Sequence, residues 1–522
     1  MGVPVEFEGL NYLWGMFVRK KPNPSGVVSI QIIDKSRGGY EVLRTIGSSS
    51  DPAEIELLVK KAKLAILEQS GQIMLPFDQQ AELEFADTFI NHIDSLELAG
   101  PELLLGKLFD EIGFNAIEDE LFRHLVITRL VFPVSKLKTV DYLFKYKGIQ
   151  ISVYSIYRYL DKLHSKQKEL IQQISLQHTL KLFGNKIAVV FYDVTTLYFE
   201  AADEDEFRKA GFSKDGKHQQ PQIVLGLLVS EGGYPLDYDV FEGNKYEGDT
   251  LIPVIEHFAA KHQPEELIVV ADAGLLSTKN IKALQAKQYQ YILGGRIKNE
   301  SDNIKEVVLS LGLKDKQSAE LIKEDNTRLI VNYKQARADK DAHNRKKGLE
   351  SLEKKVKSGI LGKTHINNKG YNKYLKLEGK ATIKVDYEKY NDDAKWDGLK
   401  GYVTNTVLPK ELIVEKYNQL WQIEKAFRIS KSDLQIRPVY HYLKKRIEAH
   451  ICISFVACKI YKELERQLKE RNSVWSPERA IDIVKTIYGV TFQSPYSNKK
   501  HSRLLLKTEE QQTIIKLFTL EK

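Results

Sequence analysis

The sequence predicts an α/β protein in which a mixed β-sheet domain carries a basic insertion and follows a mainly helical N-terminal region. Residues 100–180 show the apolar spacing of amphipathic helices, whereas residues 186–300 alternate β-rich runs with helical ones. After residue 300 the chain becomes strongly charged but keeps β-like stretches. With 522 residues, 42% of them hydrophobic, the chain is long enough for several domains with a large core.

The N-terminal part divides into two predicted regions. Residues 1–70 form a small α+β unit, because the strand-like run GVVSIQIID is followed by PAEIELLVKKAKLAILEQ, which has helical periodicity and Pro in its first turn. Residues 71–185 form a helical region. No internal repeat or low-complexity segment is evident in the sequence.

Residues 186–300 contain the elements of the predicted sheet domain. KIAVVFYDVTTLYFE is rich in β-branched and aromatic residues, and QIVLGLLVSEGGYPLDYDVFEG predicts two strands joined by a Glu-Gly-Gly turn. A helix, the strand in EELIVVADAGLLS, a second helix and the strand in YQYILGGRI follow. Three strands, then helix, strand, helix and strand, is the order of an RNase H-like mixed sheet.

The rest of the chain continues this domain after an interruption. Residues 301–405 are predicted to be a basic, β-containing insertion. Residues 406–470 return to the sheet domain with a helix around Glu424, and residues 471–522 form a helical C-terminal region.

The excess positive charge is local. The chain has 78 Lys and Arg against 70 Asp and Glu, a net charge of +8, but residues 331–380 alone contain 14 basic and 5 acidic residues. Such a concentration fits a surface that binds a nucleic-acid backbone. The alternative is a solvated charged helix in ARADKDAHNRKKGLESLEKKVKSG, and both interpretations stay open at this point.

Other features predict a cytoplasmic protein without a membrane segment. No run approaches about 18 uncharged apolar residues, and the first residues lack the basic flank and apolar core of a signal peptide. The two cysteines, Cys452 and Cys458, lie in the apolar run HICISFVACKIY and are expected to be buried free thiols.

Two aspartates stand out in the sheet domain. Asp193 lies inside an apolar and aromatic strand, where a carboxylate is costly unless it is paired or metal-bound. Asp272 stands where an apolar strand gives way to a Gly-containing loop, the usual place for groups that face a ligand. Taken alone, Asp193 can also be interpreted as a hydrogen-bonded strand residue. Asp272 can also be interpreted as a turn former or a helix cap.

A third carboxylate lies on a predicted helix, YNQLWQIEKAFRISK. At about 3.6 residues per turn, Glu424 lines up with Tyr417 seven residues before it and Lys431 seven after it, in a stripe that also holds Trp421 and Arg428. Together with Asp193 and Asp272, Glu424 provides the hard oxygen ligands that suit two Mg²⁺ ions acting on a phosphodiester.

These motifs resemble the insertion-sequence DDE transposases whose third acid sits in a Tyr-x2-Arg-x3-Glu-x6-Lys motif. Tyr417, Glu424 and Lys431 match that spacing, whereas Leu420 stands at the Arg position. YDVTTLYFE and VVADAGLLS resemble the strands of the first and second aspartate, and FEGNKYEGDTL resembles a segment between them. The similarity extends over most of the chain, including RKKPNPSGVVSIQIIDKSRGGYEVLRTIGSSSDPAEI near its start.

The resemblance implies an RNase H-like catalytic domain with a largely β insertion. It implies that the three acids are catalytic and hold two Mg²⁺ ions, with Mn²⁺ as a substitute. The partner is double-stranded DNA, bound by residues 1–70 and 71–185, and a homodimer is expected to hold two element ends together. The expected contacts with phosphates come from Tyr417, Arg428, Lys431 and Arg437. Trp396 is a candidate for stacking on an unpaired base, although a core position beside a strand is the favoured interpretation of this residue.

The leading hypothesis is a bacterial-type DNA transposase, associated with the nucleoid when it acts. It would bind terminal inverted repeats, cleave there and transfer the 3′ ends to target DNA. Two alternatives remain: a structure-specific RNase H-like nuclease, which cuts without joining, and a catalytically inactive DNA-binding protein of transposase origin. The presence of all three acids favours an enzyme.

Overall fold

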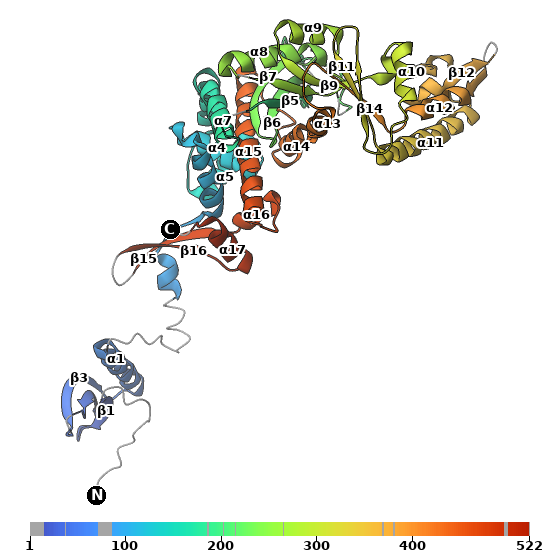
Figure 1. Ribbon diagram of the computed structural model, residues 1–522. Helices are drawn as coiled ribbons and strands as arrows, with labels where there is room; N and C mark the ends of the chain where they lie inside the picture. The colour runs from blue at the N-terminus through green and yellow to red at the C-terminus, as the bar shows by residue number, and fades with distance from the viewer. Residues whose placement is uncertain are drawn as a thin grey trace. The chain divides into compact units, whose positions relative to one another are not determined.

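The structure, a computed structural model, describes residues 15–36, 38–70, 86–184, 187–201, 203–213, 216–264, 266–367, 370–378, 382–494 and 499–520 (Figure 1). Two compact units are present: Met1–Asp94 with Phe492–His501, and Ser95–Thr491 with Ser502–Lys522. Residues 1–14 of the predicted N-terminal unit and residues 71–85 of the predicted helical region lie outside the described residues.

The first unit contains a three-stranded antiparallel sheet covered by one helix. The strands are β1 (Met16–Pro22), β2 (Val28–Asp34) and β3 (Glu41–Ser49), and the helix is α1 (Pro52–Ser70). Ile30 and Ile32 of β2 pack against Ala62 and Ile66 of α1. The predicted strand and helix are therefore confirmed.

The second unit is organised around an eight-stranded mixed sheet in the order β10-β11-β14-β9-β8-β5-β6-β7. Strands β5, β8 and β9 are parallel to one another, and the remaining pairs are antiparallel. The bounds are β5 Val189–Tyr198, β6 Gln222–Ser230, β7 Pro235–Glu242, β8 Ile268–Ala271, β9 Gln290–Gly295, β10 Ser318–Ile322, β11 Arg328–Tyr333 and β14 Leu399–Thr404.

Helices cover both faces of this sheet (Figure 1). Because side chains alternate along a strand, β5 sends Val190 and Tyr192 into a core beneath α8 (Leu251–His262) and α9 (Thr278–Ala286). It sends Val189 and Phe191 into the opposite core, which contains residues of α13 (Lys410–Asn418), α14 (Trp421–Arg428) and α15 (Lys444–Glu470). By the same alternation, Asp193 lies on the face of the sheet that packs against α13, α14 and α15.

The helical region predicted for residues 100–180 is confirmed, and its helices join the core around α15. They are α3 (Lys107–Ile112), α4 (Glu120–Val131), α5 (Lys136–Lys147), α6 (Val153–Lys162) and α7 (Lys168–Leu182), with π-helical turns at Glu102–Gly106 and Leu163–Gln167.

The C-terminal region is less helical than expected. Besides α16 (Pro477–Val484) and α17 (Glu509–Phe518) it contains β15 (Tyr488–Gln493) and β16 (Lys500–Leu505), which form a sheet with β4 (Ile93–Leu98). Four of the six residues of β15, YGVTFQ, are aromatic or β-branched, and this composition favours a strand over a helix.

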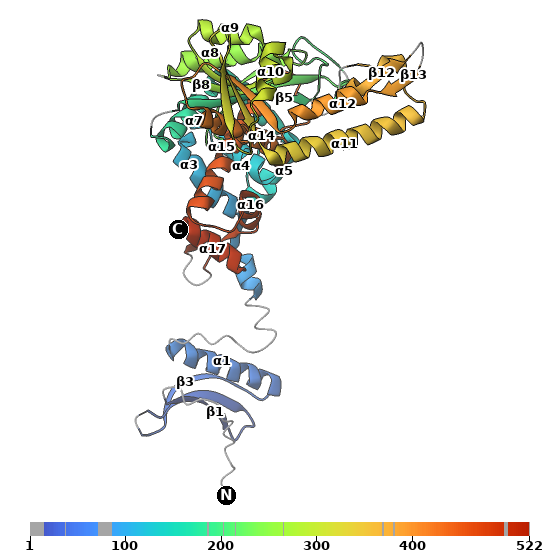
Figure 2. The ribbon, with the colours of Figure 1, turned by 45° about the vertical axis from the view of Figure 1, so that its right-hand side comes forward.

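The expectation of a largely β insertion is wrong. Strands β10, β11 and β14 extend the main sheet, but the longest element is helix α11 (Gln335–Lys357), which is preceded by α10 (Asp302–Ser310). A hairpin of β12 (Leu375–Glu378) and β13 (Thr382–Val385) and the helix α12 (Tyr387–Asp393) lie beside α11 (Figure 2). Lys, Glu, Arg and Ala dominate the α11 sequence, and these residues lose little free energy in a helix.

Two smaller expectations can be compared with the structure. Cys452 and Cys458 are both buried free thiols, as predicted. Among the described residues, no helix is long and apolar enough to cross a membrane.

Helix α15 carries a buried polar cluster against α7. Lys459 donates from Nζ to Ser175 O at 2.9 Å, and the Tyr234 hydroxyl donates to Glu463 Oε2 at 3.0 Å. His178 of α7 lies with Nε2 3.8 Å from the same Glu463 oxygen. Burial and, to a smaller extent, the charge of Lys459 lower the pKa of His178 to about 4.

His178 is expected to make folding stability depend on pH below neutrality. Its pKa is about 4 in the folded state and about 6.5 in the unfolded chain. The unfolded state therefore binds more protons between these values, and the free energy of unfolding falls as pH falls through that window. Chemical denaturation at pH 7 and pH 5 measures this effect. Between these two pH values the free energy of unfolding should fall by about 2 kcal/mol more in wild type than in His178→Gln.

His343, an exposed histidine of α11, provides the matched control. The His343→Gln variant should keep the pH dependence of wild type. Equal pH dependence in wild type and His178→Gln would contradict the prediction.

Candidate active site

Asp193 and Asp272 lie at equivalent positions of two neighbouring parallel strands. The register of β5 and β8 pairs Tyr192 with Ala271, and each aspartate follows its member of that pair by one residue. Neighbouring strands are about 4.8 Å apart, so the two aspartates stand side by side. Asp193 is half-buried and Asp272 is exposed. The structure therefore brings these two predicted residues together.

The turn after β8 positions the Asp272 carboxylate. Its Oδ1 accepts a hydrogen bond from the Gly274 N–H at 2.5 Å. Arg296 donates from Nε to Ala273 O at 3.0 Å and from Nη2 to Gly274 O at 3.4 Å. The guanidinium of Arg296 thus holds the turn behind the carboxylate and brings positive charge near it.

Tyr417 reaches the same turn over a glycine. Gly294 of β9 follows Leu293, whose partner on β8 is Ala271, so Gly294 lies beside Asp272. A Cβ on Gly294 would lie 2.5 Å from the Tyr417 hydroxyl oxygen and 2.8 Å from Ala273 N. Glycine at this position therefore makes room for the hydroxyl.

The environment of Tyr417 keeps its hydroxyl protonated. The ring packs edge to face on Tyr402, with centroids 4.8 Å apart. Burial raises the pKa of the Tyr417 phenol, and the negative charges of Asp272 and Asp193 raise it further. A buried, protonated tyrosine differs from the solvent-facing phosphate ligand that the sequence stripe predicts.

Glu424 lies on α14, a different helix from that of Tyr417. The predicted stripe assumes one continuous helix, but the chain tightens between α13 and α14. There the Leu420 N–H donates to Tyr417 O at 3.1 Å, and the Ile423 N–H donates to Leu420 O at 3.1 Å. Such i→i−3 turns have about three residues per turn, so Tyr417 is buried while Glu424 stays exposed.

Leu420, at the Arg position of the motif, is part of the core. It is buried together with Ile423 and Phe427 in the cluster between the sheet and α15. A leucine in this place makes no phosphate contact, and the chain therefore lacks this interaction of the motif.

The three carboxylates share one face of the sheet but do not form one ligand cluster. Helix α14 packs across β5 and β6, on the face to which Asp193 belongs. Within the described part of the chain, no three His, Cys, Asp or Glu side chains stand close enough to hold a metal ion together. The structure thus pairs the two aspartates and places Glu424 on the helix above them.

Lys400 of β14 is a site residue that the sequence motifs do not identify. Its Nζ lies 4.3 Å from the ring centroid of Tyr417 and 5.7 Å from that of Tyr402. Burial and the charges of nearby cations lower the pKa of Lys400, the carboxylates Asp272 and Glu424 oppose the change, and the resulting pKa is about 8. In the sequence, Lys400 could have been noticed only as a lysine within the predicted strand that precedes the Glu424 helix, in WDGLKGYVT.

The other four predicted DNA contacts occupy separate surroundings. Arg428 is exposed at the end of α14, and Lys431 is half-buried in the π-helical turn that follows. Arg437 is half-buried with its guanidinium 5.8 Å from the ring centroid of Tyr198, at the end of β5. Trp396 packs against the core beneath α8 and α9. Contacts of these residues with DNA stay predictions.

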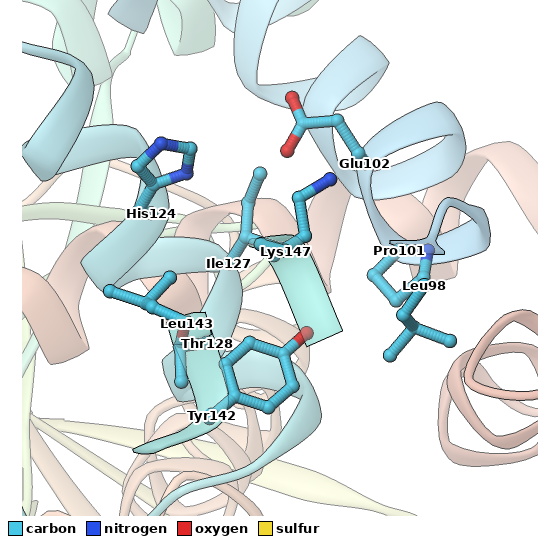
Figure 3. A pocket seen from close by; sticks show the side chains of 9 residues that line it. All are labelled: Leu98, Pro101, Glu102, His124, Ile127, Thr128, Tyr142, Leu143 and Lys147. Carbon is cyan, nitrogen blue, oxygen red and sulfur yellow. The ribbon is translucent and has the colours of Figure 1, made fainter. Parts of the chain in front are cut away.

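A small pocket lies in the helical region and contains none of the candidate residues (Figure 3). Burial lowers the pKa of His124, one of its residues. The lining consists of Leu98, Pro101, Glu102, His124, Ile127, Thr128, Tyr142, Leu143 and Lys147.

The contact over Gly294 predicts a stability cost. Gly294→Ala would drive a methyl group into the Tyr417 hydroxyl and the Ala273 backbone, so we expect a loss of about 1–3 kcal/mol in the free energy of unfolding. Tyr417→Phe removes the oxygen that meets the methyl group. The same glycine substitution should therefore cost less in the Tyr417→Phe background, which denaturant titration of the four variants measures.

Gly362→Ala is the matched control, because a Cβ at that position meets only ordinary contacts at 3.8 and 3.9 Å. Its effect should stay within about 0.5 kcal/mol. An unchanged cost of Gly294→Ala in the two backgrounds would show that Tyr417 does not lie over Gly294.

Among solved structures, the chain is similar to the piggyBac transposase synaptic complex with hairpin DNA (TM-score 0.39, 11% identity, 70% of this chain and 69% of that chain). It is also similar to the Mos1 mariner paired end complex with Mn (TM-score 0.15, 10% identity, 30% and 54%). A third similar structure is the Mos1 transposase paired-end complex with left transposon end (TM-score 0.15, 11% identity, 44% and 71%).

Among curated proteins, the chain is similar to the transposase for insertion sequence element IS231C of Bacillus thuringiensis subsp. berliner. The two are 30% identical over 133 residues, which cover 24% of this chain and 26% of the relative. The matched segment therefore spans about a quarter of the relative's length.

The family model for the transposase DDE domain matches residues 184–458. The match contains Asp193, Asp272 and Glu424 and the strands and helix that carry them. Because it extends over more than half of the sequence, the chain belongs to the transposase DDE domain family.

Proposed function

We propose that the protein is a DNA transposase that binds the terminal inverted repeats of an insertion sequence, cleaves the DNA there and transfers the 3′ ends to target DNA. The observation that carries the proposal is the side-by-side position of Asp193 and Asp272 beneath the Glu424 helix. The family match supports it. The strand order β7-β6-β5-β8-β9, with the last three strands parallel, supports an RNase H-like core.

The carboxylates fit a site for divalent metal ions. Asp193 and Asp272 offer hard oxygen ligands from adjacent strands, as Mg²⁺ prefers, and Glu424 would complete the set. When bound, two Mg²⁺ ions, or Mn²⁺ as a substitute, activate the attacking oxygen and stabilise the leaving one.

The chain's own residues orient the carboxylates and the DNA. Arg296 holds the turn that carries Asp272, and the Tyr417 hydroxyl lies over Gly294 beside that turn. Lys400 provides a positive charge near Asp272 and Glu424, where a scissile phosphate would lie. Cleavage at two element ends requires both to be held together, so a homodimer on double-stranded DNA is part of the proposal, as is a cytoplasmic location.

Loss of one acid should abolish cleavage. With a duplex carrying a repeat that flanks the gene, wild type should cut at the repeat boundary in Mg²⁺ or Mn²⁺ and not in EDTA. Asp193→Asn, Asp272→Asn and Glu424→Gln should each lower the cleavage rate by roughly 10³-fold, or about 4 kcal/mol in the activation free energy. Gel analysis of cleaved and joined products measures both steps.

Glu415→Gln is the matched control, because Glu415 is an exposed glutamate on the neighbouring helix α13. It should cut and join like wild type. Cleavage without any joined product would indicate a nuclease, and equal cleavage by Glu424→Gln and wild type would refute the assignment of Glu424.

Lys400 is expected to contribute to the cleavage rate without supporting the fold. Lys400→Met should lower the rate about 100-fold, the usual cost of losing one group that stabilises developing charge. The melting temperature should stay the same or rise, because a desolvated cation is removed. Lys395→Met removes an exposed lysine of the same segment and should change neither property.

A further inference from the structure

Helix α11 carries an exposed stripe of positive charge that no part of the carboxylate site uses. Lys340, Lys347 and Lys354 recur every seven residues, and Arg337 precedes the first of them by three. Seven residues come within about 20° of two turns, so these four side chains, here called the basic stripe, share one face of the helix. All four are exposed.

The centre of the basic stripe carries no acidic residue. The positions between its lysines on the same face, Asn344 and Ser351, are uncharged and exposed. Two of the four acids of α11 lie at the edges of this face: Asp341 pairs with Arg337, and Glu350 lies three residues after Lys347 and four before Lys354. The acids at residues 339 and 353 lie elsewhere on the helix. An ordinary solvated helix intersperses charges of both signs on each face, whereas the central positions of this face are basic or uncharged over about 26 Å, the rise of seventeen residues.

The opposite side of α11 is fixed to the protein. Leu352 is buried with Tyr374, Leu375 and Val385 of the neighbouring small elements. Arg345 forms an ion pair with Asp397, just before β14. The helix, which lies beside β12, β13 and α12 in Figure 2, is therefore held in one orientation, and its exposed basic stripe lies on the side away from Leu352.

The start of α11 is joined to the strand that carries Lys400. The Lys334 N–H donates to Gly398 O at 3.1 Å, and the Gly398 N–H donates to Asp341 Oδ2 at 3.2 Å. Arg337, which also pairs with Asp341 at 3.8 Å, is near enough for its charge to oppose the rise in the pKa of Tyr417. The basic stripe therefore begins beside the candidate site and leads away from it.

We propose that the basic stripe binds the phosphate backbone of the DNA duplex on one side of the bond that is cut. This inference rests on the proposed function, because it takes the carboxylates as the place of cleavage. Charge complementarity selects the partner: a DNA strand offers a phosphate every 3.4 Å or so along the axis, and a stripe of about 26 Å spans roughly seven base pairs. The contacts are with phosphates, so they add affinity and orientation without reading the sequence.

The first test measures the salt dependence of DNA binding by the full chain without divalent metal. The variant Lys340→Gln/Lys347→Gln removes two lysines of the basic stripe, and the control Lys346→Gln/Lys357→Gln removes two exposed lysines from the other side of α11. Each lost phosphate contact lowers the slope of log K against log salt by about 0.9. The stripe variant should thus bind with a slope smaller by about 2 and roughly 10- to 100-fold more weakly at about 0.1 M salt.

The second test locates the contact. On duplexes shortened from one end to about three base pairs from the cleavage point, wild type and the stripe variant should bind equally. Shortening from the other end should leave the difference between them unchanged. A difference that survives both truncations would overturn the proposal, because the stripe would then act on DNA without a fixed position.

The outcomes separate this inference from the proposed function. If wild type cleaves at the repeat boundary but the stripe variant binds like the control variant, the stripe assignment is overturned and the transposase proposal stands. A partner other than DNA, such as an acidic protein, would give this same result. If wild type neither cleaves nor binds the duplex, the proposed function fails first. Unchanged melting temperatures of both double variants would show that a folding defect does not cause the weaker DNA binding of the stripe variant.

Discussion

The parallel register of β5 and β8 determines the position of the groups in the candidate site. It sets Asp193 and Asp272 side by side and leaves Gly294 next to them on β9. A slip of one residue would turn every side chain of β5 to the other face. Asp193 would then enter the core beneath α8 and α9, and Tyr192 would lie where Glu424 approaches. Burial of alternate apolar residues on both faces of β5 prevents such a slip.

Two positively charged side chains, Arg296 and Lys400, lie near the carboxylate pair. Arg296 holds the turn of Asp272 through backbone carbonyls, so its guanidinium stays near the carboxylate without neutralising it in an ion pair. Lys400 is held over the rings of Tyr417 and Tyr402 and loses hydration there. A desolvated amine interacts more strongly with nearby negative charge than a solvated one. The site is therefore prepared for an anionic ligand such as a phosphodiester.

The insertion is connected to the sheet domain by shared β-sheet pairing. Three of its strands continue the main sheet, and β14 pairs directly with β9 beside the candidate site. The bonds of Gly398 connect the start of α11 to β14. A DNA-binding surface on α11 would consequently keep a constant distance from the carboxylates, which is what positioned phosphodiester chemistry requires.

Much of the fold and of the candidate site could be predicted from local patterns in the sequence. The apolar run around Asp193, the strand before Asp272 and the motif around Glu424 identified the three acids, because strand composition and motif spacing are local properties. The amphipathic helices of residues 100–180 were predictable for the same reason. The largely β insertion and the wholly helical C-terminal region were wrong, since short strands such as β15 gain their stability from partners distant in the chain.

The sequence by itself determined the three candidate acids and the kind of element in which each lies, because charge, composition and periodicity are properties of the linear chain. The tertiary structure decided how these residues face one another. It turned Tyr417 inward through the tight turn at Leu420, brought Lys400 over its ring and placed Arg337 beside the site. These relations depend on strand order and on side-chain packing between separate elements, and no local pattern encodes them.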